Sequence, residues 1–573
     1  MPQITRRSLL GAGLAGGALA TAIPAWARGG DVSHGAMARR GFDEAAGPRV
    51  DLTVARSMFG TGGKTGHAVT VNGSVPGPLL RLKEGTDIAL AVHNHVDEDT
   101  SIHWHGLLVP FHLDGVPGVS FPGIKPGETF VAEFPVRQSG TYWWHSHSGL
   151  QEQAGHYGPI IVDPAGPDPI EADRDYVVLL SEFTPLHPHT IFKKLKQGEG
   201  YFNYQQRSWT DDYPLSAEDR RMWAQMRMMP TDILDVTAAT YTYMINGHGP
   251  MDALEYAFRP GERVRLRFIN AGAMTFFNVR IPGLPMSVVQ ADGKNVKPVE
   301  VDEFQIAPAE TYDVIVEPTG EAHTLVAESM DRSGMALAHL ASRPGARTPI
   351  PPLRKPPLLT MKDMGHGGMD HGAMGHGDGG MEMGGMDMRD TSLLPPTVRA
   401  GPGVDMVAMN PVDRMGDPGV GLDDVDHRVL RYTDLRALKA DHSVRAPTRA
   451  MEIHLTGNME RYMWSFDGKR FAAVADEPIR FAYNERVRIK LVNDTMMAHP
   501  IHLHGHFFEL VNGAGHGEQP LKHTMIVQPG GSAVFDLTAD EPGDWAFHCH
   551  LLYHMHAGMF QIVTVANPDG SEA

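Results

Sequence analysis

Cysteine is nearly absent from this sequence, which has one in 573 residues. A single thiol excludes an intramolecular disulfide framework and any zinc or iron–sulfur site that needs several thiolates. Cations are also in the minority, because 50 Lys and Arg face 68 Asp and Glu and leave a formal net charge of -18. Phosphate binding needs clustered cations, so we expect no nucleic-acid partner. Long apolar runs are missing after the first 28 residues, and we therefore expect no membrane span in the mature chain.

Histidine and methionine, by contrast, are abundant, with 31 and 32 copies. Imidazole nitrogen, thiolate sulfur and thioether sulfur are ligands that copper accepts readily. The composition by itself therefore favours a copper protein.

Residues 1–28 have the features of a twin-arginine (Tat) signal peptide. Arg6 and Arg7 precede a mild apolar run that ends at Ile23, and Ala25 and Ala27 occupy the positions that a signal peptidase reads. The alternative is an N-terminal anchor helix, but the run is short and rich in Gly and Ala. We expect export of the folded chain to the periplasm.

Two short signals occur three times in the same order along the chain. The first is an alternating apolar–polar segment that ends in Asn, at 84–94, 261–270 and 484–493. The second begins with Pro, 32 to 38 residues after each Asn, and leads into another alternating segment. Period-two alternation predicts half-buried strands, and the repetition predicts three homologous domains. We predict an all-β fold of three Greek-key β-sandwiches, at 45–165, 170–345 and 426–566.

Residues 346–425 interrupt the repeat as a linker or insert. This stretch opens rich in Pro and becomes a low-complexity mixture of Met, His and Gly, which cannot bury enough apolar surface to fold by itself. Thioethers select Cu(I), so the mixture indicates a Cu(I)-binding segment, with a plain linker as the alternative. Its candidate ligands are Met361, Met364, His366, Met369, His371, Met374, His376, Met381, Met383, Met386 and Met388.

Four short histidine clusters carry the chemistry, at 102–106, 144–147, 499–505 and 548–559. Residues i and i+2 of a strand point to the same face, so each His-x-His pair can aim two imidazoles into one cleft or at adjacent metals. Two clusters fall in the first repeat and two at matching places of the third, whereas residues 271–278, which follow Asn270 in the middle repeat, contain no His. This pattern predicts a metal cluster shared by the first and third domains, with the middle domain as a spacer without copper ligands.

The only thiol, Cys549, lies between two histidines, so neighbouring side chains can bind different metals on opposite faces. A thiolate with two imidazoles and a weak axial thioether is the ligand set of a blue copper site. His554 and Met559 follow Cys549 by five and ten residues, and His499 can supply the second imidazole.

In these four clusters the sequence resembles the multicopper oxidases, three-domain cupredoxin proteins that include laccases, ascorbate oxidases and cuprous oxidases. The resemblance implies four copper ions: one type 1, one type 2 and a type 3 pair. Carried over position by position, it implies that the type 1 copper is bound by His499, Cys549, His554 and Met559. It implies His103 and His502 for type 2, and for type 3 His105, His145, His147, His504, His548 and His550. It further implies an electron path from Cys549 to His548 and His550.

Within this family the sequence is similar to the bacterial copper-resistance protein A group, in phrases such as Tyr241–Gly247 and Tyr462–Gly468. This similarity implies an oxidase that couples one-electron oxidation of Cu(I) or phenols to four-electron reduction of dioxygen to water, in copper resistance. The alternative is a periplasmic copper-sequestering protein with incidental oxidase activity, although sequestration does not need a Cys between two histidines. Expected partners are dioxygen, a Cu(I) or phenolic reductant, and other periplasmic copper-handling proteins.

Asp114 lies where the family has an acid near the type 2 copper, which implies a proton relay; the alternative is an ordinary turn Asp before Gly115. Many relatives have a carboxylate behind the type 1 histidine, where this sequence has Met555 and His556. The second proton path is therefore left open.

Overall fold

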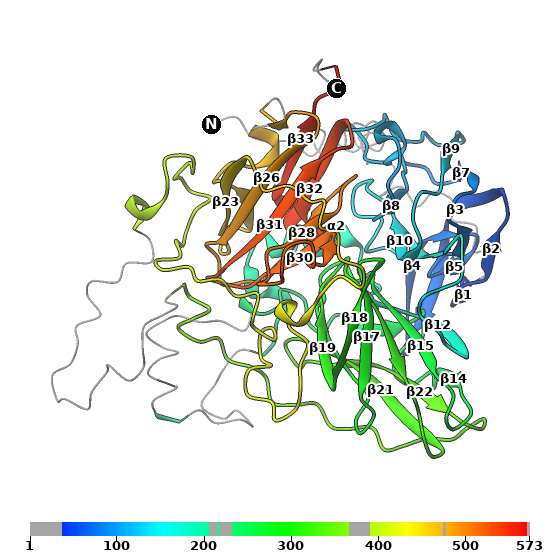
Figure 1. The fold of residues 1–573 in the computed structure, drawn as a ribbon. Coiled ribbons are helices and arrows are strands. Elements are labelled where there is room, and N and C mark those ends of the chain that lie inside the picture. The colour runs from blue at the N-terminus through cyan, green and yellow to red at the C-terminus, as the bar shows by residue number, and fades with distance from the viewer. Residues whose placement is uncertain are drawn as a thin grey trace, which may run out of the picture.

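The computed structural model describes residues 37–205, 216–217, 220, 232–365, 390–473 and 477–569. The described chain is dominated by strands, which form six sheets, two for each of three sandwiches (Figure 1). The predicted all-β class is confirmed. The first and third sandwiches lie side by side, blue and orange-red in Figure 1, and the green second sandwich contacts both.

The first sandwich pairs a six-stranded with a five-stranded sheet. The larger sheet has, in spatial order, β1 (Arg39–Arg40), β5 (Ser74–Val75), β4 (Lys64–Val71), β3 (Arg49–Thr61), β7 (Asp87–Asn94) and β9 (Thr129–Pro135). The smaller has β2 (Glu44–Ala46), β6 (Leu79–Lys83), β11 (Tyr157–Asp163), β10 (Gly140–His145) and β8 (His103–His105).

The second sandwich repeats this division into six and five strands. Its larger sheet has β13 (Thr242–Ile245), β12 (Arg174–Phe183), β15 (Val264–Asn270), β20 (Thr311–Val316), β17 (Met286–Ala291) and β18 (Lys294–Val301). Its smaller sheet has β14 (Glu255–Ala257), β22 (Met335–Ala341), β21 (Ala322–Ser329), β16 (Phe277–Arg280) and β19 (Glu303–Ile306).

The third sandwich has the same strand order as the second. Its larger sheet has β24 (Met463–Phe466), β23 (Arg449–Asn458), β26 (Glu485–Asn493), β31 (Ser532–Ala539), β28 (Phe508–Leu510) and β29 (Leu521–Lys522). Its smaller sheet has β25 (Ile479–Phe481), β33 (Phe560–Val565), β32 (Gly543–Cys549), β27 (His499–Leu503) and β30 (Thr524–Val527). The exact limits of the three domains stay a prediction.

Within the described residues, helical structure is confined to short connections. The α-helices are α2 (Pro188–Leu195) and α4 (Leu552–Ala557). The 3-10 turns are η4 (Phe111–Leu113), η5 (Glu199–Phe202), η8 (Thr391–Leu393), η9 (Tyr432–Asp434) and η10 (Phe471–Ala473).

The repeated Asn has the same structural role in all three sandwiches. Asn94, Asn270 and Asn493 end β7, β15 and β26, and each is fully buried. Each side-chain Oδ1 accepts from the backbone N–H two residues on, while Nδ2 donates to a carbonyl of the following loop and to a second carbonyl farther along the chain. In the third sandwich these carbonyls belong to Met497 and Val527. The Asn therefore sets the path of the loop that, in the first and third sandwiches, leads to the histidines.

The connection between the second and third sandwiches packs against both. Met364 is buried in a core shared by these sandwiches, and Met361 packs against that core. Both thioether side chains therefore have a packing role. Arg414 donates to Asp363 at 2.7 Å and so joins the two described parts of this connection. The other nine candidate ligands of the predicted Cu(I) segment lie outside the described residues, as do residues 1–28.

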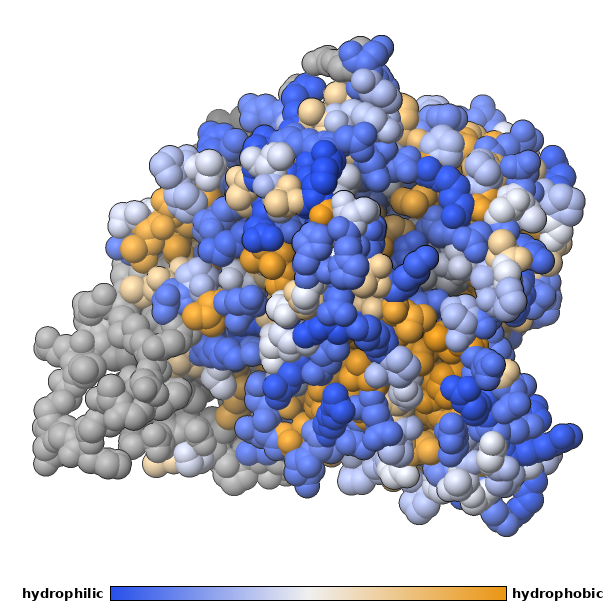
Figure 2. Space-filling model, in the orientation of Figure 1, coloured by the Kyte–Doolittle hydropathy of each residue, from blue (hydrophilic) through white to orange (hydrophobic). Residues whose placement is uncertain are grey.

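Charged and polar side chains cover most of the visible face, with apolar patches showing mainly over the second sandwich (Figure 2). Among the described residues, no helix is long and apolar enough to cross a membrane.

Candidate metal centre

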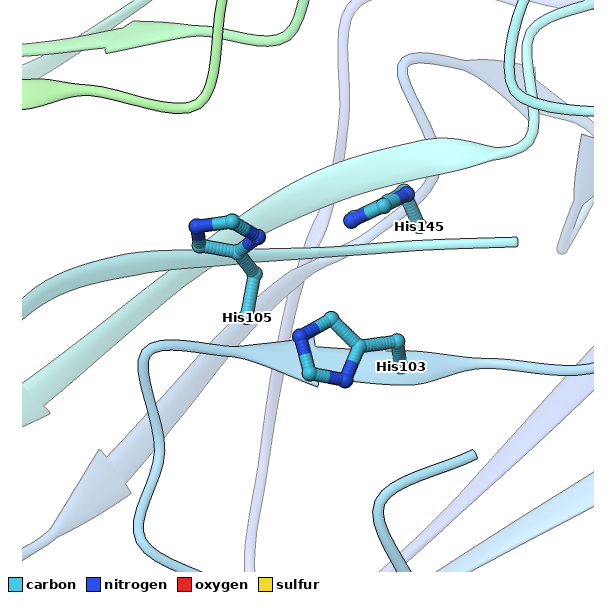
Figure 3. Close-up of side chains that lie close together, drawn as sticks. All are labelled: His103, His105 and His145. Carbon is cyan, nitrogen blue, oxygen red and sulfur yellow. The ribbon is translucent and has the colours of Figure 1, made fainter. Parts of the chain in front are cut away.

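The first two histidine clusters meet on adjacent strands of one sheet. In the antiparallel pair β8–β10, His103 lies opposite His145 and His105 lies opposite Trp143. Because side chains alternate along a strand, these imidazoles lie on one face, as Figure 3 shows for His103, His105 and His145. Their ligand nitrogens lie within 4.8 Å of one another.

The third and fourth clusters are arranged in the same way in the third sandwich. In the pair β27–β32, His502 lies opposite His548 and Ile501 lies opposite Cys549. Alternation therefore puts His548 on one face of the sheet and Cys549 on the other. Two metal sites can thus lie back to back, with the peptide bonds on either side of Cys549 joining them.

The imidazoles from the first and third sandwiches come together between them. The closest pairs of ring centres are His105 with His502 at 3.8 Å and His103 with His504 at 3.9 Å. His504 Nε2 lies 3.0 Å from His548 Nε2, and the His147 and His548 rings are 5.2 Å apart. Eight histidines thus form one cluster (the histidine cluster): His103, His105, His145, His147, His502, His504, His548 and His550.

A separate group lies on the opposite face of β32. His499 Nδ1 is 3.6 Å from Cys549 Sγ and 3.4 Å from His554 Nδ1. Three ligands placed in a plane at roughly 2.0–2.3 Å around one ion have separations of this size. Met559 is fully buried, and its carbonyl accepts from the Cys549 N–H at 3.1 Å, which brings residue 559 beside the thiol.

Hydrogen bonds select which ring nitrogen most of these histidines present. In three members of the histidine cluster, Nδ1 lies near a backbone or carboxylate oxygen and leaves Nε2 free: His103 at Asp114 O, His145 at Glu152 and His502 at His523 O. His105 is reversed, with Nε2 near Thr524 Oγ1 and Nδ1 left without a partner. In the Cys549 group the pattern reverses. His499 Nε2 pairs with Thr495 Oγ1 at 2.8 Å and His554 Nε2 with Asp235 at 3.0 Å, so both offer Nδ1.

Several buried imidazole nitrogens have no hydrogen-bond partner, which is the test of whether a metal fits here. They include Nε2 of His103, His145, His147, His502 and His550, and Nδ1 of His105. A buried polar atom without a partner is costly, and a group of bound cations would satisfy these lone pairs. The donor set therefore fits a metal cluster.

Electrostatics suit metal ligation as well. Burial, with neighbouring imidazoles adding, holds the pKa of His105, His145 and His502 well below the ordinary value, so the rings are neutral. A neutral imidazole is the form that binds a metal. Burial raises the pKa of the Cys549 thiol, and ligation to a cation would stabilise its thiolate.

Asp114 contacts two members of the histidine cluster. Its carboxylate lies 2.8 Å from His504 Nδ1 and 3.3 Å from His103 Nδ1, and it is 1% exposed. Burial by itself raises the pKa of Asp114, but the two histidines outweigh burial and lower it overall. An ionised carboxylate in this place orients both rings.

Three buried residues of the centre carried no motif in the sequence. Glu152 bonds His145, Asp235 bonds His554, and His523 packs edge-on against His105 at 4.8 Å between ring centres. Glu152 lies seven residues after His145, so its distance in sequence is the only available signal. Asp235 and His523 come from segments with no repeat signature, and only the tertiary fold brings them to the site.

Comparisons with known proteins agree with this geometry. Three family models described as multicopper oxidase match residues 54–166, 174–342 and 445–569. The chain belongs to the multicopper oxidase family and is an oxidoreductase with cupredoxin-like domains.

Relatives at higher identity are copper-resistance proteins. Copper resistance protein A of Escherichia coli is 46% identical, with 91% of this chain and 93% of that protein covered. The Copper resistance protein A homolog of Pseudomonas syringae pv. tomato is also 46% identical, with 99% and 100% covered.

Solved structures with the same fold are more distant in sequence. Fet3p, described as a multicopper oxidase that functions in iron import, aligns with a TM-score of 0.64 at 19% identity, covering 91% of this chain and 90% of that chain. The laccase from Botrytis aclada aligns with a TM-score of 0.62 at 20% identity, covering 92% and 88%.

Proposed function

We propose that this chain is a four-copper oxidase that oxidises Cu(I), and also phenols, with dioxygen as the electron acceptor, in periplasmic copper resistance. The observation that carries the proposal is the complete set of ten buried or half-buried motif histidines and one thiol, converging on two adjacent centres. The copper-resistance role rests on the two relatives at 46% identity. A protein that only sequestered copper would not need two centres joined through one Cys.

We assign the ligands as the sequence implied. His499, Cys549 and His554, with Met559 as the axial thioether, would hold a type 1 copper. His103 and His502 would hold the type 2 copper. The remaining six of the histidine cluster would hold the type 3 pair: His105, His145, His147, His504, His548 and His550.

Copper bound in these two centres would supply reversible one-electron chemistry at one and four-electron reduction of dioxygen at the other. The chain's own part is geometric. The backbone at the end of β32 links the Cys549 thiol to His548, within the strand, and to His550, directly after it, which is the route that we propose for electrons. Hydrogen bonds to Asp114, Glu152 and Asp235 hold the rings in place, so that little reorganisation is needed.

Protons must also reach the dioxygen-reducing centre. We propose Asp114 as a relay, because its carboxylate touches Nδ1 of both His103 and His504 while being almost fully buried. Location in the periplasm after Tat export belongs to the same proposal, on the strength of Arg6 and Arg7 in the sequence.

The test compares dioxygen uptake by the copper-loaded protein with Cu(I) and with a phenol as electron donors. We expect turnover with both and a higher kcat/KM for Cu(I). Copper binding without dioxygen uptake for either donor would favour sequestration instead. Turnover of phenol alone would remove Cu(I) as the substrate.

Deletion of Met361–Met388 tests whether this segment handles Cu(I). Because thioethers select Cu(I), deletion should reduce Cu(I) oxidation more than phenol oxidation. Met361 and Met364 pack against the core, so a shorter deletion of residues 366–388 is the cleaner variant. Equal losses for both donors would identify the segment as a linker.

A further inference from the structure

Three exposed histidines lie together beside the helix that carries His554. His187 and His189 lie at the start of α2, and His556 lies on α4, two residues after His554. The His187 and His189 ring centres are 5.3 Å apart, and those of His189 and His556 are 6.4 Å apart. None of the three belongs to the ligand set of the two centres described above.

We propose that His187, His189 and His556 form a docking site for the substrate Cu(I) ion, from which its electron passes to the His554 side of the buried centre. This inference rests on the proposed Cu(I) oxidase function. It adds a metal site, on the surface and away from the resident coppers, to that function.

The ring separations are those of imidazoles that share one ion. With a nitrogen–metal distance of about 2.0 Å, two coordinating rings have centres about 5 to 6.5 Å apart, from a tetrahedral to a linear arrangement. Both measured separations fall in this range. Imidazole binds copper in either oxidation state, so the site can hold Cu(I) and release Cu(II).

The surroundings of the three rings favour a cation on one side and oppose it on the other. His187 and His189 line a cavity of about 90 Å³ together with Glu98 and Asp99. Arg56 also lines this cavity, but it is paired with Asp97 at 2.9 Å and with Glu98 at 3.0 Å. Arg56 still acts on His187 as a like charge, and Lys196 acts on His556 in the same way, so these two groups oppose cation binding.

A continuous aromatic contact leads from this surface site to His554. Phe192 of α2 lies 4.8 Å from His556 and 6.3 Å from Tyr462, measured between ring centres. Tyr462 in turn lies 5.7 Å from His554. The backbone of α4 gives a second and shorter covalent route, through Met555 alone.

The redox step balances with the reactants already named. Each docked Cu(I) loses one electron and leaves as Cu(II), and four such oxidations with four protons reduce one dioxygen to two waters. No bond to the protein other than the imidazole–copper bonds forms or breaks at the docking site.

The experiment uses the copper-loaded full chain and the double variant His189→Gln with His556→Gln. We expect the KM for Cu(I) to rise at least tenfold, and the ratio of kcat/KM for Cu(I) to that for a phenol to fall by a similar factor. As a readout independent of turnover, binding of Ag(I), which has the same charge as Cu(I) and is not oxidised, should fall by one equivalent.

Two further variants guard against non-specific effects. His442 and His516 are also exposed, with ring centres 6.2 Å apart. Each of their rings bonds a backbone carbonyl, just as His187 Nδ1 accepts from the backbone N–H of His189. Replacing His442 and His516 by Gln should leave the KM for Cu(I) as it is. Lys196→Gln removes the opposing charge and should lower this KM, a gain that a folding defect cannot imitate.

The outcomes separate the docking site from the oxidase function. If the parent chain oxidises Cu(I) and the double variant keeps both its KM and its Ag(I) equivalents, the docking site is wrong and the function stands. If the parent does not oxidise Cu(I) but the double variant loses one Ag(I), the function is wrong and the cation site stands.

Discussion

Cys549 is the single thiol of the chain, and it lies fully buried between two imidazoles that face the other way. Because no other thiolate can take its place, Cys549→Ser should abolish both the blue absorption and substrate oxidation. Visible absorption of the copper-loaded protein measures the first, and dioxygen uptake the second. A variant that stays blue would contradict the assignment of the His499–Cys549–His554 group.

His103 tests the other centre in the same way. His103→Ala removes an Nε2 that has no partner in the described structure, but leaves the Cys549 group untouched. We expect the blue absorption to persist while dioxygen uptake is lost. Full turnover in this variant would refute the placement of the dioxygen-reducing centre in the histidine cluster.

Asp114 and Asp235 form a matched pair of carboxylates, one beside each centre. Asp114→Asn should lower copper retention in the histidine cluster roughly 10- to 100-fold, since it loosens His103 and His504, and should leave the blue band in place. Asp235→Asn should shift the blue band, because it alters the bond to His554 Nε2. Copper retained against a chelator and visible spectra measure the two effects. Identical spectra and copper contents for both variants would contradict separate centres.

The Asn turn that follows β7, β15 and β26 is the element that the three sandwiches share. Asn493→Ala leaves the carbonyls of Met497 and Val527 and the N–H of Thr495 without their buried partner, at a cost of about 1–3 kcal/mol for each unsatisfied group. The same turn positions Thr495, which bonds His499, so we expect loss of blue colour as well as of stability.

Asn270→Ala is the control for this element. Asn270 makes the same turn in the second sandwich, where no motif histidine follows. Asn270→Ala should lower the free energy of unfolding by a similar amount, measured by denaturant unfolding, and should leave the blue absorption intact. Equal loss of colour in both variants would show that the turn acts only through global stability.

At the scale of the whole molecule, a buried ion cluster joins the second and third sandwiches. Lys522 lies 3.0 Å from Asp292 and 3.1 Å from Glu310, and all three are fully buried. Lys522→Met leaves two buried carboxylates without their cation and should destabilise the protein by about 3–5 kcal/mol. Lys297→Met is the control, because its pair with Glu518 joins the same two sandwiches but is exposed, and it should cost at most about 1 kcal/mol.

The pH dependence of this cluster follows from Lys522. Burial lowers the pKa of Lys522, but Asp292 and Glu310 outweigh burial and raise it overall. A raised pKa in the folded state means that the contribution is fully present below the unfolded value of about 10.4 and is lost as pH rises through the folded pKa. The melting temperature of the parent should therefore fall above about pH 10.4. The Lys522→Met variant should lack this fall.

The sequence by itself determined the local chemistry and the number of domains. Period-two alternation, the three Asn positions and the His-x-His spacing act over a few residues, and the backbone geometry of a strand converts them directly into faces and turns. For that reason the all-β class and the grouping of the four histidine clusters could be predicted. The packing of Met364 in a core could not be predicted, because the composition of the segment around it is that of a metal-binding segment.

Only the tertiary structure decided which groups meet across long sequence distances. Asp114 reaches His504, Asp235 reaches His554, and Asp292 of the second sandwich bonds the backbone at His523 beside the histidine cluster. The second sandwich is therefore more than a spacer, although its residues include no motif ligand. Such contacts depend on how three sandwiches dock, which is fixed by the shape and burial of their surfaces and leaves no periodic signal in the chain.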